Sequence, residues 1–99
     1  MAESKILKKI KTGSVGTDTN YYVSGNVATV YVNNFPITNT SSTTLIGTLP
    51  SDVVPLVQVY ASGFASGVVS YIRVDTDRKV YAYRQNAGAV LATVTFPIY

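Results

Sequence analysis

Apolar and polar residues alternate along most of the chain after residue 13, with the period of two that is typical of β-strands with one buried face. In the stretch VATVYV, Ala28, Val30 and Val32 point to one side, and this wholly apolar set is expected to face the core. By the same pattern we predict strands over residues 20–24, 26–33, 44–49, 55–62, 67–75, 79–84 and 89–99.

These predicted strands are short and closely spaced, which is typical of antiparallel sandwiches and small barrels. We therefore expect an all-β fold, an antiparallel, jelly-roll-like β-sandwich of about seven or eight strands. Residues 13–99 would form this single domain, because a chain of 99 residues is long enough for one hydrophobic core. Gly25-Asn26 indicates a bulge or tight bend, and Asp75-Thr76-Asp77-Arg78 indicates a hairpin turn.

The first twelve residues differ from the rest and allow two interpretations, a stem or an edge segment. In ESKILKKIK, the residues Ile6, Leu7 and Ile10 would form a narrow apolar stripe on a helix, suited to association with a stem. A helix of about two turns is not stable alone. The overlapping stretch KKIKTGSV is equally compatible with an extended edge strand.

The octet TLPSDVVP, residues 48–55, interrupts the strand pattern with two prolines. Proline cannot donate a ladder hydrogen bond and pushes the preceding residue toward an extended conformation. Leu49-Pro50 and Val54-Pro55 are therefore expected at an edge or in a connection. We interpret the octet as a stiff crossover by which the chain leaves one sheet and enters the other.

Charge is scarce and unevenly distributed. Only 13% of the residues are charged, which suggests that part of the surface is covered by other subunits. The net charge of +3 comes from lysines near the N-terminus, and beyond Lys11 basic and acidic residues balance. This distribution lacks the basic stripe of a nucleic-acid-binding face, and no apolar run is long enough for a membrane span. We expect neither nucleic acid nor membrane as a partner.

The side chains that carry most enzymatic chemistry are scarce. Histidine and cysteine are absent, which excludes thiolate metal sites and the commonest general base. Asp75 and Asp77 could hold a hard cation, but two carboxylates alone favour an ordinary turn. No glycine-rich phosphate loop or nucleophile elbow occurs. We expect no enzymatic activity, no metal and no cofactor.

Tyrosine and arginine residues concentrate in the hairpin over residues 67–84. Tyr71 and Arg73 share a face of the first strand, Tyr81 and Tyr83 share a face of the second, and Arg84 ends it. Both residue types are favoured on surfaces that a partner covers, and tyrosine rings also stack on sugars. These five residues are therefore candidates for a ligand-binding surface or for a subunit interface.

Three stretches together carry a resemblance to a known group of proteins. VATVYVNN, TTLIGTLPSDVVP and SYIRVDTDRKVYAY, with a Ser/Thr-rich loop between the first two, resemble C-terminal modules of bacteriophage tail proteins. The similarity covers residues 26–99 and is greatest to baseplate appendages and tail-fibre tips of phages that infect Gram-positive bacteria. In those modules the late hairpin usually carries Asp-Gly, whereas this chain has Asp77-Arg78, so a different turn type is expected.

The resemblance implies a non-enzymatic homotrimer at the end of a fibre, often after a helical stem. It implies a location in the virion tail, after synthesis in the host cytoplasm, with other tail or baseplate proteins as partners. Such tips commonly attach the virion to cell-wall saccharide, and this is our leading hypothesis. The alternatives are a structural trimeric connector that positions another receptor-binding protein, and a small-barrel module that binds single-stranded nucleic acid.

Overall fold

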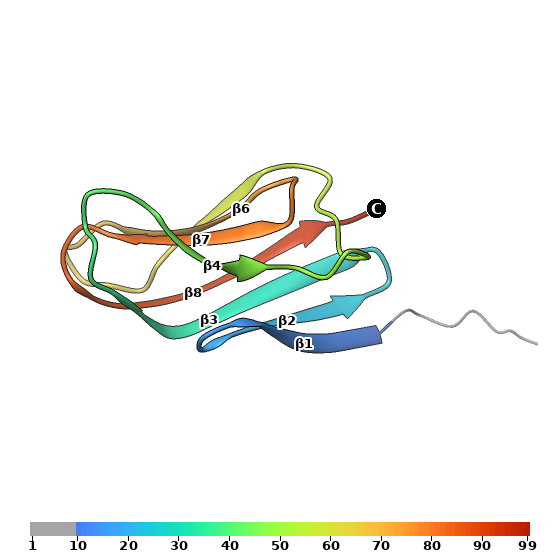
Figure 1. Ribbon diagram of the computed structural model, residues 1–99, viewed down its shortest axis with the longest axis horizontal. Helices are drawn as coiled ribbons and strands as arrows, with labels where there is room; N and C mark the ends of the chain where they lie inside the picture. Colours follow the sequence, from blue (N-terminus) through green and yellow to red (C-terminus); the bar gives the residue numbers. More distant parts are fainter. Residues whose placement is uncertain (1–9) are drawn as a thin grey trace, which may run out of the picture.

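The computed structural model describes residues 10–99, which form two four-stranded antiparallel sheets packed face to face (Figure 1). This confirms the all-β sandwich predicted from the sequence. Ile6 and Leu7 of the predicted stem lie outside the described residues. The strands are β1 (Ile10–Gly16), β2 (Thr19–Ser24), β3 (Val27–Ile37), β4 (Thr44–Thr48), β5 (Val59–Ser62), β6 (Ser70–Val74), β7 (Lys79–Arg84) and β8 (Gly88–Pro97).

Each sheet combines three hairpin-linked strands with one strand from elsewhere in the chain. The first sheet has the order β1-β2-β3-β8, and the second has the order β4-β7-β6-β5. In the second sheet, β5, β6 and β7 follow one another along the chain. Strand β4 precedes them, is joined to β5 by a long connection and lies beside β7, which is a Greek-key arrangement. Residues 10–12, the described part of the segment predicted as either stem or edge, belong to the edge strand β1, in which the side chain of Ile10 is 63% exposed.

Alternate residues of both sheets point inward and form one core. Ala28, Val30 and Val32 are fully or almost fully buried, as their alternation predicts. Facing them from the second sheet are Ile72 and Val80, which have no exposed surface. Burying an aliphatic side chain of this size contributes roughly 1.5–3 kcal/mol to folding, so this layer between the sheets supplies most of the stabilisation.

Strand β3 continues past its predicted end because of a β-bulge. The pairing of β3 with β8 shifts between Asn33 and Phe35, and Asn34 adopts a φ of 63°. Asparagine tolerates this left-handed conformation better than most residues. The extra residue shifts the alternation by one position, so that Phe35 and Ile37 are buried, and not residues 34 and 36 as an unbroken pattern would require.

The TLPSDVVP octet does not carry the chain from one sheet to the other, as the sequence suggested. The connection starts after β4 and ends before β5, at the two edges of the same sheet. Midway the connection contacts the first sheet just after β8. Pro55 and Ile98 form an isolated antiparallel β-bridge, and the Tyr99 amide donates to the Val54 carbonyl. The prolines thus stiffen the long Greek-key connection, which closes one end of the sandwich with the buried side chain of Val53.

Two predicted strands are shorter than expected by four residues each. The strand over 55–62 is reduced to β5, because residues 55 and 56 bond to the end of β8 and not to β6. The strand over 67–75 is reduced to β6, which begins only at Ser70. Its pairing with β5 ends there, where the Gly63 amide donates to the Ser70 carbonyl.

The turn between β6 and β7 has the geometry that a glycine would allow, although it contains none. The Arg78 amide donates to the Asp75 carbonyl at 2.9 Å, and Arg78 itself has a φ of 75°. Arg78 thus adopts the left-handed conformation that glycine takes without strain. A left-handed conformation costs a non-glycine residue roughly 1–2 kcal/mol. The Arg78 guanidinium offsets this cost through its hydrogen bond to the Leu49 carbonyl, at 2.8 Å.

Edge strand β1 is fastened at two places, to strand β4 of the second sheet and to the connection that follows β4. Near its end, Val15 and Gly16 lie so close to Ile46 and Gly47 of β4 that a Cβ on either glycine would overlap a backbone oxygen of the other strand. At its start, Lys11 Nζ donates to both carboxylate oxygens of Asp52, at 2.6 and 2.7 Å. The hydrogen bond to Asp52 raises the pKa of Lys11, which stabilises its charged form.

Candidate functional site

The tyrosine residues of the hairpin lie together on the outer face of the second sheet. Tyr71 is directly opposite Tyr83, and Arg73 is directly opposite Tyr81. Directly opposite residues of an antiparallel pair point to the same side of the sheet, so all four share one surface. The sequence placed them on one face of each strand, and the register brings the two faces together.

A fifth residue, Tyr60 of β5, joins this group. It pairs with Arg73 across the strands, and 58% of its surface is exposed. Tyr60 was not identified from the sequence. The alternation in PLVQVYAS nevertheless directs Tyr60 to the outer side of the strand, since Val59 and Ala61 point inward. We call the surface formed by Tyr60, Tyr71, Arg73, Tyr81 and Tyr83 the tyrosine–arginine face.

Tyr71 is the centre of an aromatic row. Its ring centroid lies 5.2 Å from that of Tyr83, with planes tilted by 31°, and 5.7 Å from that of Tyr60, with planes tilted by 57°. These separations are within the range of favourable aromatic pairs. The three rings support one another and present a row that crosses β7, β6 and β5.

The Arg73 side chain is held in place from two sides. Its Nε and Nη2 donate to the two carboxylate oxygens of Asp75, at 2.9 and 3.1 Å, and its Cζ lies 4.3 Å from the centroid of the Tyr81 ring. Gln58 Nε2 also donates to Asp75, at 2.8 Å. Burial lowers the pKa of Arg73, but the hydrogen bonds and the attraction to Asp75 outweigh it, so the pKa is raised.

Arg84, the remaining candidate from the sequence, lies apart from this face. It pairs with Ser70, whose side chain is buried, and its Nη1 donates to the carbonyl oxygens of Asn86 and Ala87 at 3.1 and 2.8 Å. A Cβ at Gly88 would collide with the same guanidinium. Arg84 thus holds the turn between β7 and β8, and Tyr60 takes its place in the candidate site.

The carboxylates near the tyrosine–arginine face are engaged within the protein. Asp75 accepts from Arg73 and Gln58, and Asp77 Oδ1 accepts from the Lys79 amide at 3.1 Å. Among residues 10–99 there is no group of three or more side chains of the metal-ligating types. The same residues enclose no pocket, so the face is an open platform and not a cleft.

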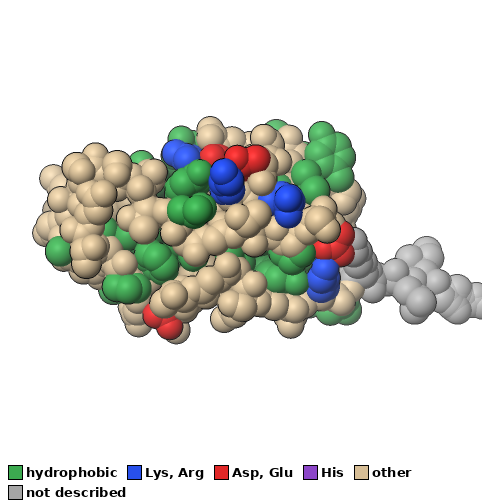
Figure 2. All heavy atoms as spheres, in the orientation of Figure 1, with side chains coloured by type: hydrophobic (Ala, Val, Ile, Leu, Met, Phe, Trp, Pro, Cys, Tyr) green, Lys and Arg blue, Asp and Glu red, His purple; other side chains and the backbone are tan. Residues whose placement is uncertain are grey.

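Acidic and basic side chains mostly lie next to one another, and no large patch of one sign covers the visible side of the molecule (Figure 2). No helix in the described part of the chain is long and apolar enough to cross a membrane. Comparison of the chain with protein-family models, with curated proteins and with solved structures finds no match. The candidate site therefore stands on its own residues and geometry.

Proposed function

We propose that this chain is a non-enzymatic attachment module of a phage tail or baseplate, which binds host cell-surface saccharide through the tyrosine–arginine face. The observation that carries the proposal is the row of three tyrosine rings beside a fixed guanidinium on an open sheet face. The resemblance of residues 26–99 to tail-fibre tips and baseplate appendages supplies the biological setting.

The chemistry of the face suits a sugar ligand. Aromatic faces bind the C–H surfaces of sugar rings, while tyrosine hydroxyls and a guanidinium donate hydrogen bonds to hydroxyl or anionic substituents. Arg73 and the rings of Tyr71 and Tyr83 are already supported by their neighbours. Binding would therefore order few side chains, which lowers its entropic cost. An open platform also leaves a polymer free to continue beyond both ends of the site.

A platform without a pocket buries little of each sugar, so we expect weak binding at a single copy. Several copies at the end of a fibre compensate, because linked sites raise the apparent affinity by about 10² to 10⁴ without new contacts. This requirement fits the homotrimer that the resemblance implies. Binding therefore has to be measured with many copies of the chain displayed together.

The test uses the protein displayed in many copies on a bead. We expect the beads to retain at least one polysaccharide or teichoic-acid fraction from Gram-positive cell walls, and to retain no single-stranded oligonucleotide. Empty retention across the saccharide fractions would contradict the proposal. Oligonucleotide binding that weakens steeply with salt would favour the nucleic-acid-binding alternative instead.

A further inference from the structure

The carboxylate of Asp75 lies beside Arg73 on the tyrosine–arginine face. Asp75 directly follows β6, and its oxygens accept from Arg73 Nε and Nη2, at 2.9 and 3.1 Å, and from Gln58 Nε2, at 2.8 Å. The side chains of Arg73 and Asp75 remain 21% and 19% exposed. Both members of this ion pair can therefore contact a ligand that lies on the face.

The ion pair offers a ligand a donor and an acceptor side by side. Arg73 Nη1 makes neither of the bonds to Asp75, so its N–H groups can donate to a ligand. Asp75 Oδ2 accepts from Arg73 Nη2 and has a further lone pair. A sugar hydroxyl both donates and accepts, so two adjacent hydroxyls can bond to Nη1 and Oδ2 together. A phosphodiester only accepts and has no proton to offer the carboxylate.

The charges of the hairpin balance on the tyrosine–arginine face. Arg78 turns away, because its guanidinium donates to a carbonyl oxygen of the connection after β4. The remaining cations, Arg73 and Lys79, are matched in number by the carboxylates of Asp75 and Asp77. An anionic polymer therefore gains no net attraction from this surface and meets two carboxylates on it.

An anion could bind the Arg73 guanidinium fully only by taking the place of Asp75. The two bonds between these side chains are charge-assisted and match the fork of the guanidinium to the two carboxylate oxygens. Their loss would leave a largely buried carboxylate with Gln58 as its remaining hydrogen-bond donor, which is costly. The Tyr81 ring, 4.3 Å from Arg73 Cζ, also holds the guanidinium where it is.

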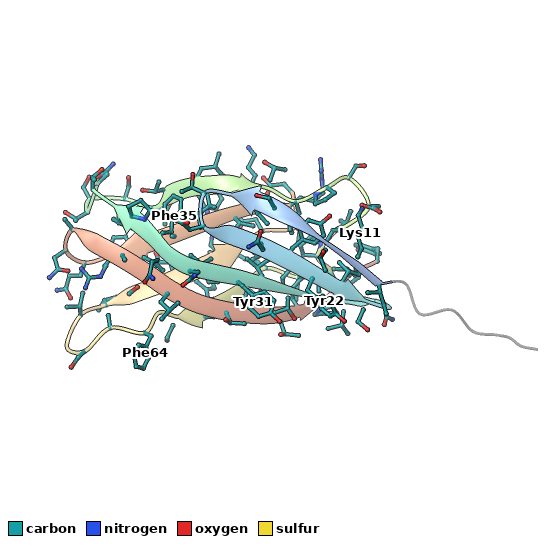
Figure 3. All side chains as sticks on the ribbon, turned by 90° about the horizontal axis from the view of Figure 1, so that it is seen from below. Lys11, Tyr22, Tyr31, Phe35 and Phe64 are labelled. Atoms are coloured by element: carbon teal, nitrogen blue, oxygen red, sulfur yellow. The ribbon has the colours of Figure 1, made fainter. Side chains whose placement is uncertain are left out.

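Exposed tyrosine rings alone do not distinguish this face. Tyr22 and Tyr31 are 38% and 47% exposed on the outer side of the first sheet (Figure 3). The residues directly opposite Tyr31 are Asn20 and Thr93, and neither is charged. The fixed ion pair beside the rings is what sets the tyrosine–arginine face apart from that surface.

We infer that Asp75 completes the ligand site with Arg73, and that the site takes neutral saccharides with adjacent hydroxyl groups in preference to anionic wall polymers. The inference rests on the proposed function and narrows it to one class of ligand. Tyr60, which lies directly opposite Arg73 and is 58% exposed, would contact the C–H surface of the sugar while the ion pair bonds to its hydroxyls.

The experiment separates Gram-positive wall polysaccharides by anion exchange into a neutral and a phosphate-bearing fraction, and offers both to the bead-displayed protein. We expect retention of the neutral fraction, changing less than about twofold between about 50 and about 500 mM salt, since no net charge is screened. Asp75→Asn removes the charged acceptor and releases Arg73. It should weaken retention of the neutral fraction at least about tenfold and add salt-sensitive retention of the phosphate-bearing fraction.

Asp18→Asn is the matched control, because it makes the same change of charge in the turn between β1 and β2. Asp18 has a φ of 50°, which asparagine also tolerates, and this variant should bind both fractions like the wild type. Melting temperatures verify that both variants fold, and the salt dependence of the wild type tests the inference without any substitution.

The possible failures of the two proposals differ. Wild-type retention confined to the phosphate-bearing fraction and lost at high salt would overturn this inference and leave the attachment role intact. Unchanged retention of the neutral fraction by folded Asp75→Asn would do the same. Retention of neither fraction would overturn the attachment role, and this inference with it.

Discussion

We expect Gly47→Ala to destabilise the domain by about 3 kcal/mol or more, because the new methyl group would overlap the carbonyl oxygen of Val15. Both strands are held by their own ladders, β1 by β2 and β4 by β7, so neither backbone can retreat without losing hydrogen bonds. The edge of the sandwich where the two sheets meet would open. For a domain of this size, such a loss lowers the melting temperature by at least about 12 °C.

Thermal and urea unfolding of the variant check this expectation. Gly25→Ala is the matched control, because Gly25 has a φ of 64° but no neighbour within 4 Å of an added Cβ. That change strains only the backbone of the β2-β3 turn and should cost roughly 1–2 kcal/mol. Equal destabilisation by the two substitutions would show that the backbone of β4 at Gly47 is not in close contact with that of β1 at Val15.

The second large effect concerns ligand binding at the tyrosine–arginine face. We expect Tyr71→Ala to weaken binding of the bead-displayed protein to its saccharide fraction by at least about 100-fold. Truncating the central aromatic residue of a site typically costs about 2 kcal/mol, or roughly thirtyfold, and the losses multiply when several linked sites engage one polymer. Tyr71 is central because its ring contacts both Tyr60 and Tyr83.

Two controls separate ligand binding from folding. Tyr71→Phe keeps the ring and should retain most of the binding. Tyr99→Ala removes a tyrosine that is 79% exposed but lies outside the tyrosine–arginine face, and it should bind like the wild type. Unchanged retention by a folded Tyr71→Ala protein would mean that this face does not contact the saccharide.

Local alternation predicted the fold class and most strands because inward positions such as Ala28 and Val30 repeat strictly. It failed where the partner of a segment lies far away in the chain. Residues 55 and 56 have the composition of a strand but bond to the end of β8, a contact that no local pattern encodes. The bulge at Asn34 was likewise invisible to a period of two, although asparagine is enriched at the positive φ that Asn34 adopts.

The candidate site shows the same division. Four of its residues were identified from residue type and alternation, but their union on one surface depends on the register between β6 and β7. Tyr60 belongs to the site only because β5 pairs with β6. Arg84 does not belong to it, because its guanidinium donates to carbonyl oxygens of the following turn.

The most direct test of the attachment role is to map amide chemical shifts of the labelled protein as soluble cell-wall saccharide fragments are added. We expect changes concentrated in β5, β6 and β7, around Tyr60, Tyr71 and Arg73, with the strands of the first sheet unaffected. Changes confined to the strands of the first sheet, or no changes at saturating fragment, would contradict it.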